Sequence, residues 1–258
     1  MSKRSSIVKP TGDGEVSVTP GAWSSFNFDF SRAPIFYPLS KLTIEEANFA
    51  SARFYDESSF SETIFTRTAD FSWAKFTRTA DFWSATFAQT ATFRAVTFAQ
   101  TADFSWAKFT HTADFSLTTF TQTADFSGAT FKSSVNFSGA TFKSTANFSR
   151  AIFVQNTDFS EAMFEENSPK FVTVNEDLDK TFRALFAALS DNQGERDFTV
   201  REGSKLINLG KATLRGEPFI IPVGTVLFDW DDETQGYITS EPAEPLDESD
   251  EAQENKTE

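Results

Sequence analysis

The sequence predicts an all-β solenoid, and three observations lead to this fold class. Phenylalanine recurs from Phe49 to Phe164 at alternating spacings of five and six residues. A small residue stands two positions before most of these phenylalanines, and a polar residue stands between the two. A fixed short period over about 115 residues is typical of stacked units that each contact their neighbours. The regular phenylalanines are 22 of the 32 in the chain: Phe49, Phe54, Phe60, Phe65, Phe71, Phe76, Phe82, Phe87, Phe93, Phe98, Phe104, Phe109, Phe115, Phe120, Phe126, Phe131, Phe137, Phe142, Phe148, Phe153, Phe159 and Phe164.

Each repeated segment has the pattern of a short strand with one apolar and one polar side. In an extended segment, a phenylalanine and the residue two positions before it point to the same side, and the residue between them points to the other. The intervening polar residues include Asp70, Lys75, Asp81, Asp103, Lys108, Asp114, Asp125, Asn136, Asn147 and Asp158. A helix is disfavoured because Thr, Ser, Asp and Phe dominate, whereas good helix formers are scarce. We therefore expect rings of short strands, stacked in parallel, with phenylalanine inside.

The chain before the array divides into two parts. Residues 1–20 are polar, and we expect them to be loose. Residues 21–48 contain SFNFDF (25–30), in which phenylalanines alternate as in a strand but do not join the register of the array. We interpret 21–48 as an N-terminal cap, because repeat arrays need atypical end units that cover the core and the unpaired backbone.

The array, at 49–164, contains the nonamer TADFSWAKF at 68–76 and again at 101–109. With TADFSGATF (123–131) and NFSGATF (136–142), these residues resemble the Phe-rich branch of the pentapeptide-repeat family. The resemblance implies a right-handed, four-sided β-helix with one pentapeptide on each face. The extra residue in every second unit departs from the family pattern, and a four-sided coil then takes 22 residues. We expect the extra residues in widened corners at 66–68, 77–79, 110–112 and 121–123.

The segment 165–230 is predicted to contain a helix and a small β segment. Leu178, Phe182, Leu185, Phe186 and Leu189 follow the spacing of one helix face, which predicts a helix at 175–194. Short strands are expected within 197–230. This segment either caps the last coil or joins two subunits in a homodimer through the helix. Residues 231–258 are rich in Glu, Asp, Pro and Ser, which predicts an acidic disordered tail.

Composition and charge favour a protein without a catalytic site. The array holds ten acidic and nine basic residues, whereas residues 165–258 hold 22 acidic and nine basic ones, so the net charge of −14 is mainly C-terminal. The absence of Cys excludes disulfides and thiolate metal sites, and His111 has no second His or Cys as a partner. We expect no enzyme, no cofactor and no metal. No apolar leader or membrane-spanning stretch is visible, so we expect a cytoplasmic protein with no membrane partner.

Two sets of outward residues are candidates for a binding site. The apolar set, Trp73, Trp83, Trp106 and Leu117, stands at outward or turn positions where later units have Gly128, Gly139, Arg150 and Glu161. Exposed tryptophan is unfavourable unless something covers it, either the N-terminal cap or a partner protein. In the acidic set, a 22-residue coil aligns Asp81, Asp103 and Asp125 on one face and Asp70, Asp114 and Asp158 on another. These stripes either imitate DNA phosphate or bond to nearby backbone, and the basic residues of the array favour the second role.

The sequence therefore predicts a non-enzymatic scaffold that presents a flat rod surface to another protein. The family resemblance implies an alternative, since some members resemble B-form DNA and modulate the topoisomerase gyrase. The nearly neutral charge of the array argues against this alternative, because an imitator of DNA needs a dense anionic surface. No direct binding of nucleic acid is expected.

Overall fold

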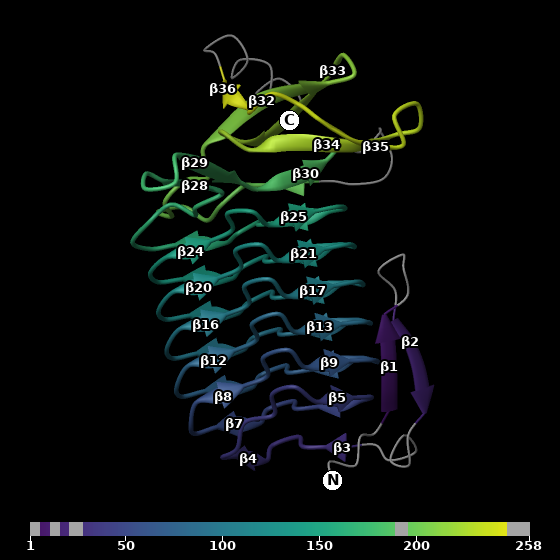
Figure 1. The fold of residues 1–258 in the computed structure, drawn as a ribbon. Helices are drawn as coiled ribbons and strands as arrows, with labels where there is room; N and C mark the ends of the chain where they lie inside the picture. Colours follow the sequence, from purple (N-terminus) through teal and green to yellow (C-terminus); the bar gives the residue numbers. More distant parts are fainter. Residues whose placement is uncertain (1–5, 11–15, 21–27, 189–195, 247–258) are drawn as a thin grey trace.

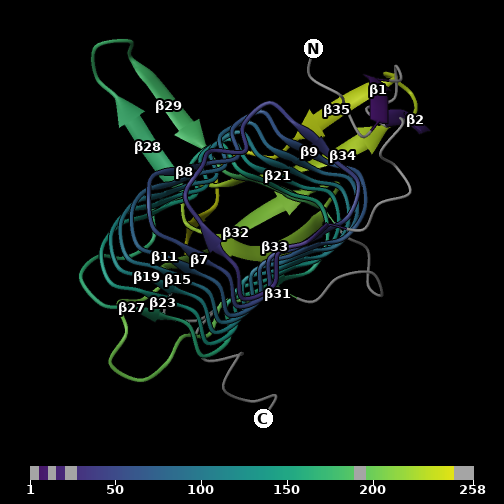
Figure 2. The ribbon, with the colours of Figure 1, turned by 90° about the horizontal axis from the view of Figure 1, so that it is seen from below.

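The computed structural model describes residues 6–10, 16–20, 28–188 and 196–246, and its main body is a β-solenoid of about six turns (Figure 1). Two-residue strands from successive coils pair in parallel and form four faces. Within the array each strand residue pairs with the residue 22 positions further along, such as Ala69 with Ala91 and Phe76 with Phe98. The predicted coil length is therefore confirmed. Seen along the axis, the coils superimpose around one core (Figure 2).

The four faces follow one another along each coil, and we number them in that order. Face 1 contains β3 (Phe28–Asp29), β6 (Ala47–Asn48), β10 (Ala69–Asp70), β14 (Ala91–Thr92), β18 (Ala113–Asp114), β22 (Val135–Asn136), β26 (Thr157–Asp158) and β31 (Arg196–Asp197). Face 2 contains β4 (Pro34–Ile35), β7 (Arg53–Phe54), β11 (Lys75–Phe76), β15 (Thr97–Phe98), β19 (Thr119–Phe120), β23 (Thr141–Phe142) and β27 (Met163–Phe164). Face 3 contains β8 (Ser58–Ser59), β12 (Ala80–Asp81), β16 (Ala102–Asp103), β20 (Ala124–Asp125) and β24 (Ala146–Asn147). Face 4 contains β5 (Thr43–Ile44), β9 (Ile64–Phe65), β13 (Thr86–Phe87), β17 (Lys108–Phe109), β21 (Thr130–Phe131), β25 (Ile152–Phe153), β30 (Leu185–Ala187), β34 (Val226–Asp231) and β35 (Gly236–Thr239).

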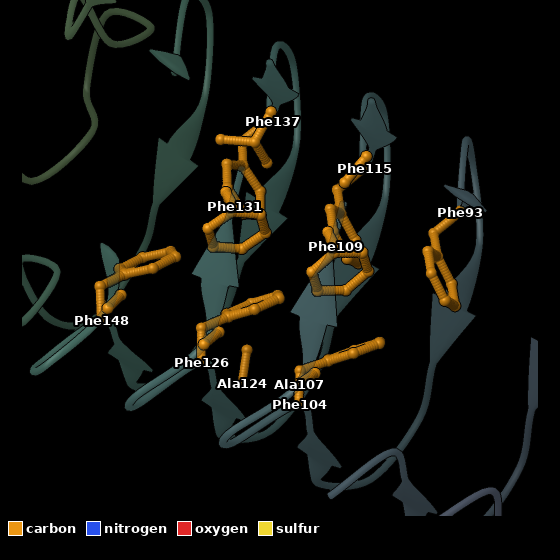
Figure 3. Packing of buried hydrophobic residues seen from close by; sticks show 14 of the residues in the cluster. Phe93, Phe104, Ala107, Phe109, Phe115, Ala124, Phe126, Phe131, Phe137 and Phe148 are labelled. Atoms are coloured by element: carbon orange, nitrogen blue, oxygen red, sulfur yellow. The ribbon is translucent and has the colours of Figure 1, made fainter. Parts of the chain in front are cut away.

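The core consists of four columns of phenylalanine, one behind each face. All 22 regular phenylalanines are buried, as the sequence predicts. Neighbours within a column stack with nearly parallel rings, with centroids 4.2 Å apart for Phe54 and Phe76. Rings from faces 1 and 3 meet edge to face across the centre, as Phe104 and Phe115 do at 5.2 Å and 85° (Figure 3). Both arrangements are favourable for aromatic pairs, and the small residues two positions earlier leave room for them.

The four corners alternate between tight and wide. The tight corners, between faces 1 and 2 and between faces 3 and 4, are β-turns such as the one closed by Ala74 N–H and Phe71 C=O. Their third residue has a positive φ. The wide corners take the extra residue at the predicted positions, among them 66–68 and 77–79. There the Thr77 hydroxyl donates a hydrogen bond to the Phe54 carbonyl of the preceding coil.

The N-terminal part is more ordered than expected within the described residues. β1 (Ser6–Pro10) and β2 (Val16–Pro20) form an antiparallel hairpin that lies beside face 4, so the prediction of a loose 1–20 is wrong there (Figure 1). Residues 28–48 form a first, shorter coil rather than a separate cap. Phe30 stacks on Phe49 at 5.3 Å, and three aliphatic side chains continue the other columns: Ile35, Leu39 and Ile44. Residues 21–27 lie outside the described part of the chain.

The predicted C-terminal helix is wrong, because the described residues contain no helix. Instead, β28 (Val172–Asn175) and β29 (Lys180–Arg183) form a hairpin, which is followed by β30. Phe186 does not belong to a helix face. It continues the phenylalanine column of face 4 by stacking on Phe153, with ring centroids 4.8 Å apart. Leu178 lies exposed in the hairpin turn. Tertiary packing here overrides the local pattern, and Leu189 lies outside the described residues.

The expected small β segment is present and closes the C-terminal end of the solenoid. β34 extends face 4, and β32 (Leu209–Leu214), β33 (Glu217–Pro222) and β36 (Glu244–Pro245) form a sheet above the last coil (Figure 1). Phe171 and Phe198 stack on Phe148 and Phe159, so this segment covers the core. The disordered tail was predicted too long: residues 231–246 are structured, since β35 pairs with β34 and β36 with β32. Residues 247–258 lie outside the described chain.

Candidate partner-binding site

The tight corners place one residue of each turn outward in the left-handed region of φ. The corner between faces 1 and 2, the 1–2 corner, presents Ser51, Trp73, Ala95, Leu117, Gly139 and Glu161. The corner between faces 3 and 4, the 3–4 corner, presents Glu62, Ser84, Trp106, Gly128 and Arg150. A turn with positive φ at its third residue favours glycine, and only Gly128 and Gly139 meet this preference in the two series.

A shallow groove follows the 1–2 corner and has a volume of about 330 Å³. Leu117 and Gly139 form its apolar floor, and the serines of successive coils border it. A Cβ at Gly139 would come within 2.9 Å of the Leu117 Cδ2, so the leucine occupies space that only glycine leaves open. Arg94 and Arg201 line the groove from different coils. The groove residues are Arg94, Ser116, Leu117, Ser138, Gly139, Ser160, Glu161 and Arg201.

Both arginines of the groove have polar neighbours that fix their direction. Arg94 Nη1 donates a hydrogen bond to Ser116 Oγ at 2.9 Å. Arg201 Nε lies 3.7 Å from a carboxylate oxygen of Glu161, and both side chains are largely exposed. An exposed ion pair of this kind contributes little to stability, so the side chains of Arg201 and Glu161 remain available to a partner.

At the 3–4 corner, Trp106 has contacts within the chain. A Cβ at Gly128 would lie 2.9 Å from Trp106 Cδ2, which places the indole over the glycine of the next coil. The guanidinium of Arg150 lies 5.8 Å from the Trp106 ring centroid and 3.3 Å from that of Phe182. This cation–π arrangement links the corner to the β28–β29 hairpin. Trp106 therefore has a structural contact that Trp73 lacks among the described interactions.

The four predicted apolar residues are all exposed, but they do not form one patch. Trp73 is 61% exposed and Leu117 47% exposed at the 1–2 corner, with Ala95 between them in the series. Trp83 (43%) and Trp106 (48%) lie at the 3–4 corner on the other side of the coil. Of the two alternatives for these side chains, cover by the N-terminal segment is not seen for its described residues, since all four remain exposed.

The predicted acidic stripes are aligned as expected. Asp81, Asp103 and Asp125 stack on face 3, and Asp70, Asp114 and Asp158 occupy alternate coils of face 1, where Thr92 and Asn136 stand between them. Each of these carboxylates accepts a hydrogen bond from the backbone N–H two residues later, as Asp70 does from Ser72 at 2.8 Å. This bond holds the chain as it enters the tight corner.

The crowding of face 3 has an electrostatic consequence. Burial raises the pKa of Asp103, and the neighbouring Asp125 and Asp81 add to this effect, although hydrogen bonds from Ser105 oppose it. Face 1 avoids the same crowding because neutral residues separate its carboxylates. Within the described residues no group of three or more His, Asp or Glu side chains could hold a metal ion. His111 lies exposed at the wide corner formed by residues 110–112.

Sequence reasoning missed the arginines of the groove and the contacts of Arg150. Arg94 could have been found, since the 22-residue register places it beside Ser116 at the 1–2 corner. Arg201 and Phe182 could not, because they follow the array and reach the corners only through the C-terminal fold. Trp230 and Tyr237, which meet at 5.2 Å on the β34–β35 hairpin, form a further exposed aromatic pair.

The fold defines the protein as a four-sided β-solenoid, and comparison with known proteins identifies its repeats. Residues 115–163 match the model of the pentapeptide-repeat family, described as pentapeptide repeats in nine copies. This part of the array therefore consists of pentapeptide repeats, as the sequence motifs indicate. No curated protein and no solved structure matches the chain. In the described part of the chain, no helix is long and apolar enough to cross a membrane.

Proposed function

We propose that the protein is a non-enzymatic, cytoplasmic scaffold that binds another protein through its 1–2 corner. The observation that carries this proposal is the placement of Trp73 and Leu117 at exposed turn positions with φ of 61° and 58°. A non-glycine residue in this region is disfavoured by roughly 1–2 kcal/mol, and later coils place glycine at equivalent turns. The exposed parts of these bulky apolar side chains do not serve the stability of the free protein.

The groove beside these residues supports the same role. Its apolar floor at Leu117 and Gly139 can receive an apolar side chain, while Arg94, Arg201 and the serines offer donors for polar groups at its rim. Aromatic and arginine residues are enriched at the centres of protein interfaces. Trp73 lies two coils before Leu117 at the same corner, so one extended partner segment running along the solenoid axis can contact both side chains.

The test is affinity capture from a cytosolic extract, with matched variants of the two corners. Trp73→Ser/Leu117→Ser removes the apolar side chains of the 1–2 corner, and Trp83→Ser changes the 3–4 corner. Lys75→Ser, on the outer side of face 2, is the control. We expect one protein to be retained by the wild type, by Trp83→Ser and by Lys75→Ser, and to be lost with the double variant. Equal retention by the double variant contradicts the proposal.

Salt separates this proposal from the alternative function. Apolar contacts at the 1–2 corner should persist at high ionic strength, where exposed charge interactions are screened. The alternative, a DNA-mimicking modulator of gyrase, draws on the carboxylate stripes of faces 1 and 3. The backbone bonds of these carboxylates and the nearly balanced charge of the array oppose it. Inhibition or protection of gyrase in a supercoiling assay, lost as salt rises, would favour the alternative.

A further inference from the structure

The N-terminal end of face 2 carries cations that have no partner. Arg53 of β7 and Lys75 of β11 are direct register partners on adjacent coils, and both side chains are exposed. Arg78, also exposed, follows Lys75 at the wide corner between faces 2 and 3, the 2–3 corner. Within the residues that the structure describes, none of these three cationic groups forms an ion pair or a hydrogen bond. Like charges on directly opposed strand residues are destabilising, so an anionic ligand would relieve this arrangement.

Exposed aromatic rings lie beside these cations. β4 and β7 pair in register at the N-terminal end of the solenoid, which places Phe36 against Tyr55 at the start of the 2–3 corner (Figure 1). The two rings stack with centroids 5.3 Å apart and an interplanar angle of 13°. Phe36 is 53% exposed, Tyr55 41%, and the next residue of the first coil, Tyr37, 79%. Such exposure of three large rings is unfavourable unless a ligand covers them.

This combination of rings and cations is confined to the first coils, and the fold does not require it. The outward residues of 97–100, 119–122 and 141–144 occupy the equivalent positions of the following coils. They are Thr, Ala, Gln and Ser, with Lys143 as the single cation and no aromatic residue. The same backbone therefore forms with small neutral side chains. We define the aromatic–basic patch as Phe36, Tyr37, Arg53, Tyr55, Lys75 and Arg78.

We propose that the aromatic–basic patch binds single-stranded nucleic acid. Phosphate groups of the strand bind Arg53, Lys75 and Arg78, and its bases stack on the outermost rings, Phe36 and Tyr37. A single strand offers both kinds of group at once, because its unpaired bases expose the ring faces that a duplex hides. The patch is separate from the groove and from Leu117 at the 1–2 corner, and this inference does not depend on the binding of another protein there.

The surrounding charge favours a short strand over an extended anionic surface. Within the described residues, the outward column of face 2 contains no acidic residue from β4 to β27. Asp56 and Glu57 are exposed at the 2–3 corner beside the patch. A strand that follows face 2 avoids these carboxylates, whereas an anionic bilayer would meet them together with a chain of net charge −14. The nearly neutral charge of the array led to the expectation that nucleic acid is not bound, but that average hides the local excess of cations on face 2.

The first test measures the salt dependence of binding. The full chain is titrated into a fluorescently labelled oligothymidylate of about twelve nucleotides, and anisotropy is followed at several salt concentrations. Three phosphate contacts predict that the logarithm of the association constant falls with the logarithm of salt concentration with a slope of about −2, since each contact contributes about 0.7. Arg53→Gln and Lys75→Gln should each weaken binding and reduce the slope by about 0.7. Lys143→Gln removes the same charge at the 2–3 corner outside the patch and should bind as the wild type does.

The second test separates base stacking from charge. Tyr37→Ala should weaken binding by about tenfold and leave the salt slope unchanged, because stacking of one base on one ring contributes on that scale. Tyr37→Phe keeps the ring and should bind as the wild type does. Tyr237→Ala removes a similarly exposed ring from β35, outside the patch, and is the matched control. An abasic strand of the same length should bind the wild type more weakly by at least the same factor.

The choice of ligand is tested with the same variants. Binding of the oligothymidylate, or of an oligouridylate of the same length, that is lost with Lys75→Gln and Tyr37→Ala supports the proposal. No binding of either strand at low salt overturns it. It is equally overturned if a duplex of the same length, a polyaspartate peptide or vesicles that contain phosphatidylserine bind as tightly as the strand does and depend on the same two residues.

Discussion

The indole of Trp106 lies over Gly128 of the next coil, in space that any β-carbon at position 128 would enter. Gly128 also has a φ of +68°, where other residues are strained. The glycine thus serves the turn and the tryptophan together. The same relationship recurs at the 1–2 corner between Leu117 and Gly139. An exposed side chain in one coil is matched by a missing side chain in the next.

Gly128→Ala should therefore lower the stability of the protein by about 1–3 kcal/mol, because it adds strain at positive φ and displaces Trp106. Gly203→Ala is the matched control, since Gly203 has a φ of +83° with nothing within 4 Å of its added Cβ. The difference between their denaturant midpoints isolates the contact with Trp106. A shift in Trp fluorescence should accompany Gly128→Ala alone, and equal effects of the two substitutions would show that the indole is not held by the glycine.

Asp103→Asn should stabilise the protein at neutral pH by about 0.2–1 kcal/mol, the scale of one cross-strand pair. Burial, with Asp125 and Asp81, raises the pKa of Asp103 in the folded state. The folded protein then holds this proton more tightly than the unfolded chain does, so ionisation of Asp103 lowers stability as pH rises from about 4 through the raised pKa. The gain from Asn should consequently vanish at pH values below about 4.

Asp114→Asn provides the comparison for this pH profile. Asp114 makes the same backbone bond as Asp103, but its neighbours in the column are Thr92 and Asn136. Thermal unfolding followed from acid to neutral pH should show a gain for Asp103→Asn and none for Asp114→Asn. Similar profiles for the two variants would mean that crowding of carboxylates on face 3 has no effect on stability.

The sequence predicted the array well because its register is encoded in every unit. The spacing of phenylalanine determines the coil length, the inward and outward sides and the wide corners, and each repeat indicates the same register. The helix at 175–194 failed for the opposite reason: Phe186 has one role in a column far from its sequence neighbours, and local spacing does not reveal it. Single elements without repetition depend on tertiary contacts that a pattern does not record.

The candidate site was predicted only in part, because some of its residues belong to the repeated units and others do not. The exposure of Trp73 and Leu117 follows from their positions in the unit, and the structure agrees. The grouping of four apolar residues was not foreseeable from the unit alone, since it depends on which tight corner each one occupies. Arg201 reaches the groove from beyond the array, where it bridges to Glu161. Such contacts arise only when the C-terminal segment folds onto the last coil.

Ala102→Leu should overpack the core and lower stability by about 1–3 kcal/mol. Ala102 is fully buried between Ala80 and Ala124 of adjacent coils, next to the stacked rings of phenylalanine. Gln100→Leu adds an apolar side chain at an exposed corner nearby and should have little effect. Equilibrium unfolding in guanidinium measures the stability of both variants. A stability equal to that of the wild type for Ala102→Leu would contradict the close packing of the columns.

Truncation after Glu166 should cause aggregation, because it removes the cover of the last coil. Phe171, Phe186 and Phe198 stack on Phe148, Phe153 and Phe159, and β31 and β30 pair with the edges of β26 and β25. Without these residues the end of the solenoid exposes aromatic rings and an unpaired strand edge, a combination that favours association between molecules. Truncation after Leu246 leaves this cover intact and is the control. Static light scattering and circular dichroism should show large particles for the short form and the behaviour of the full chain for the control. A monodisperse short form with an intact β signal would show that the coil end needs no cap.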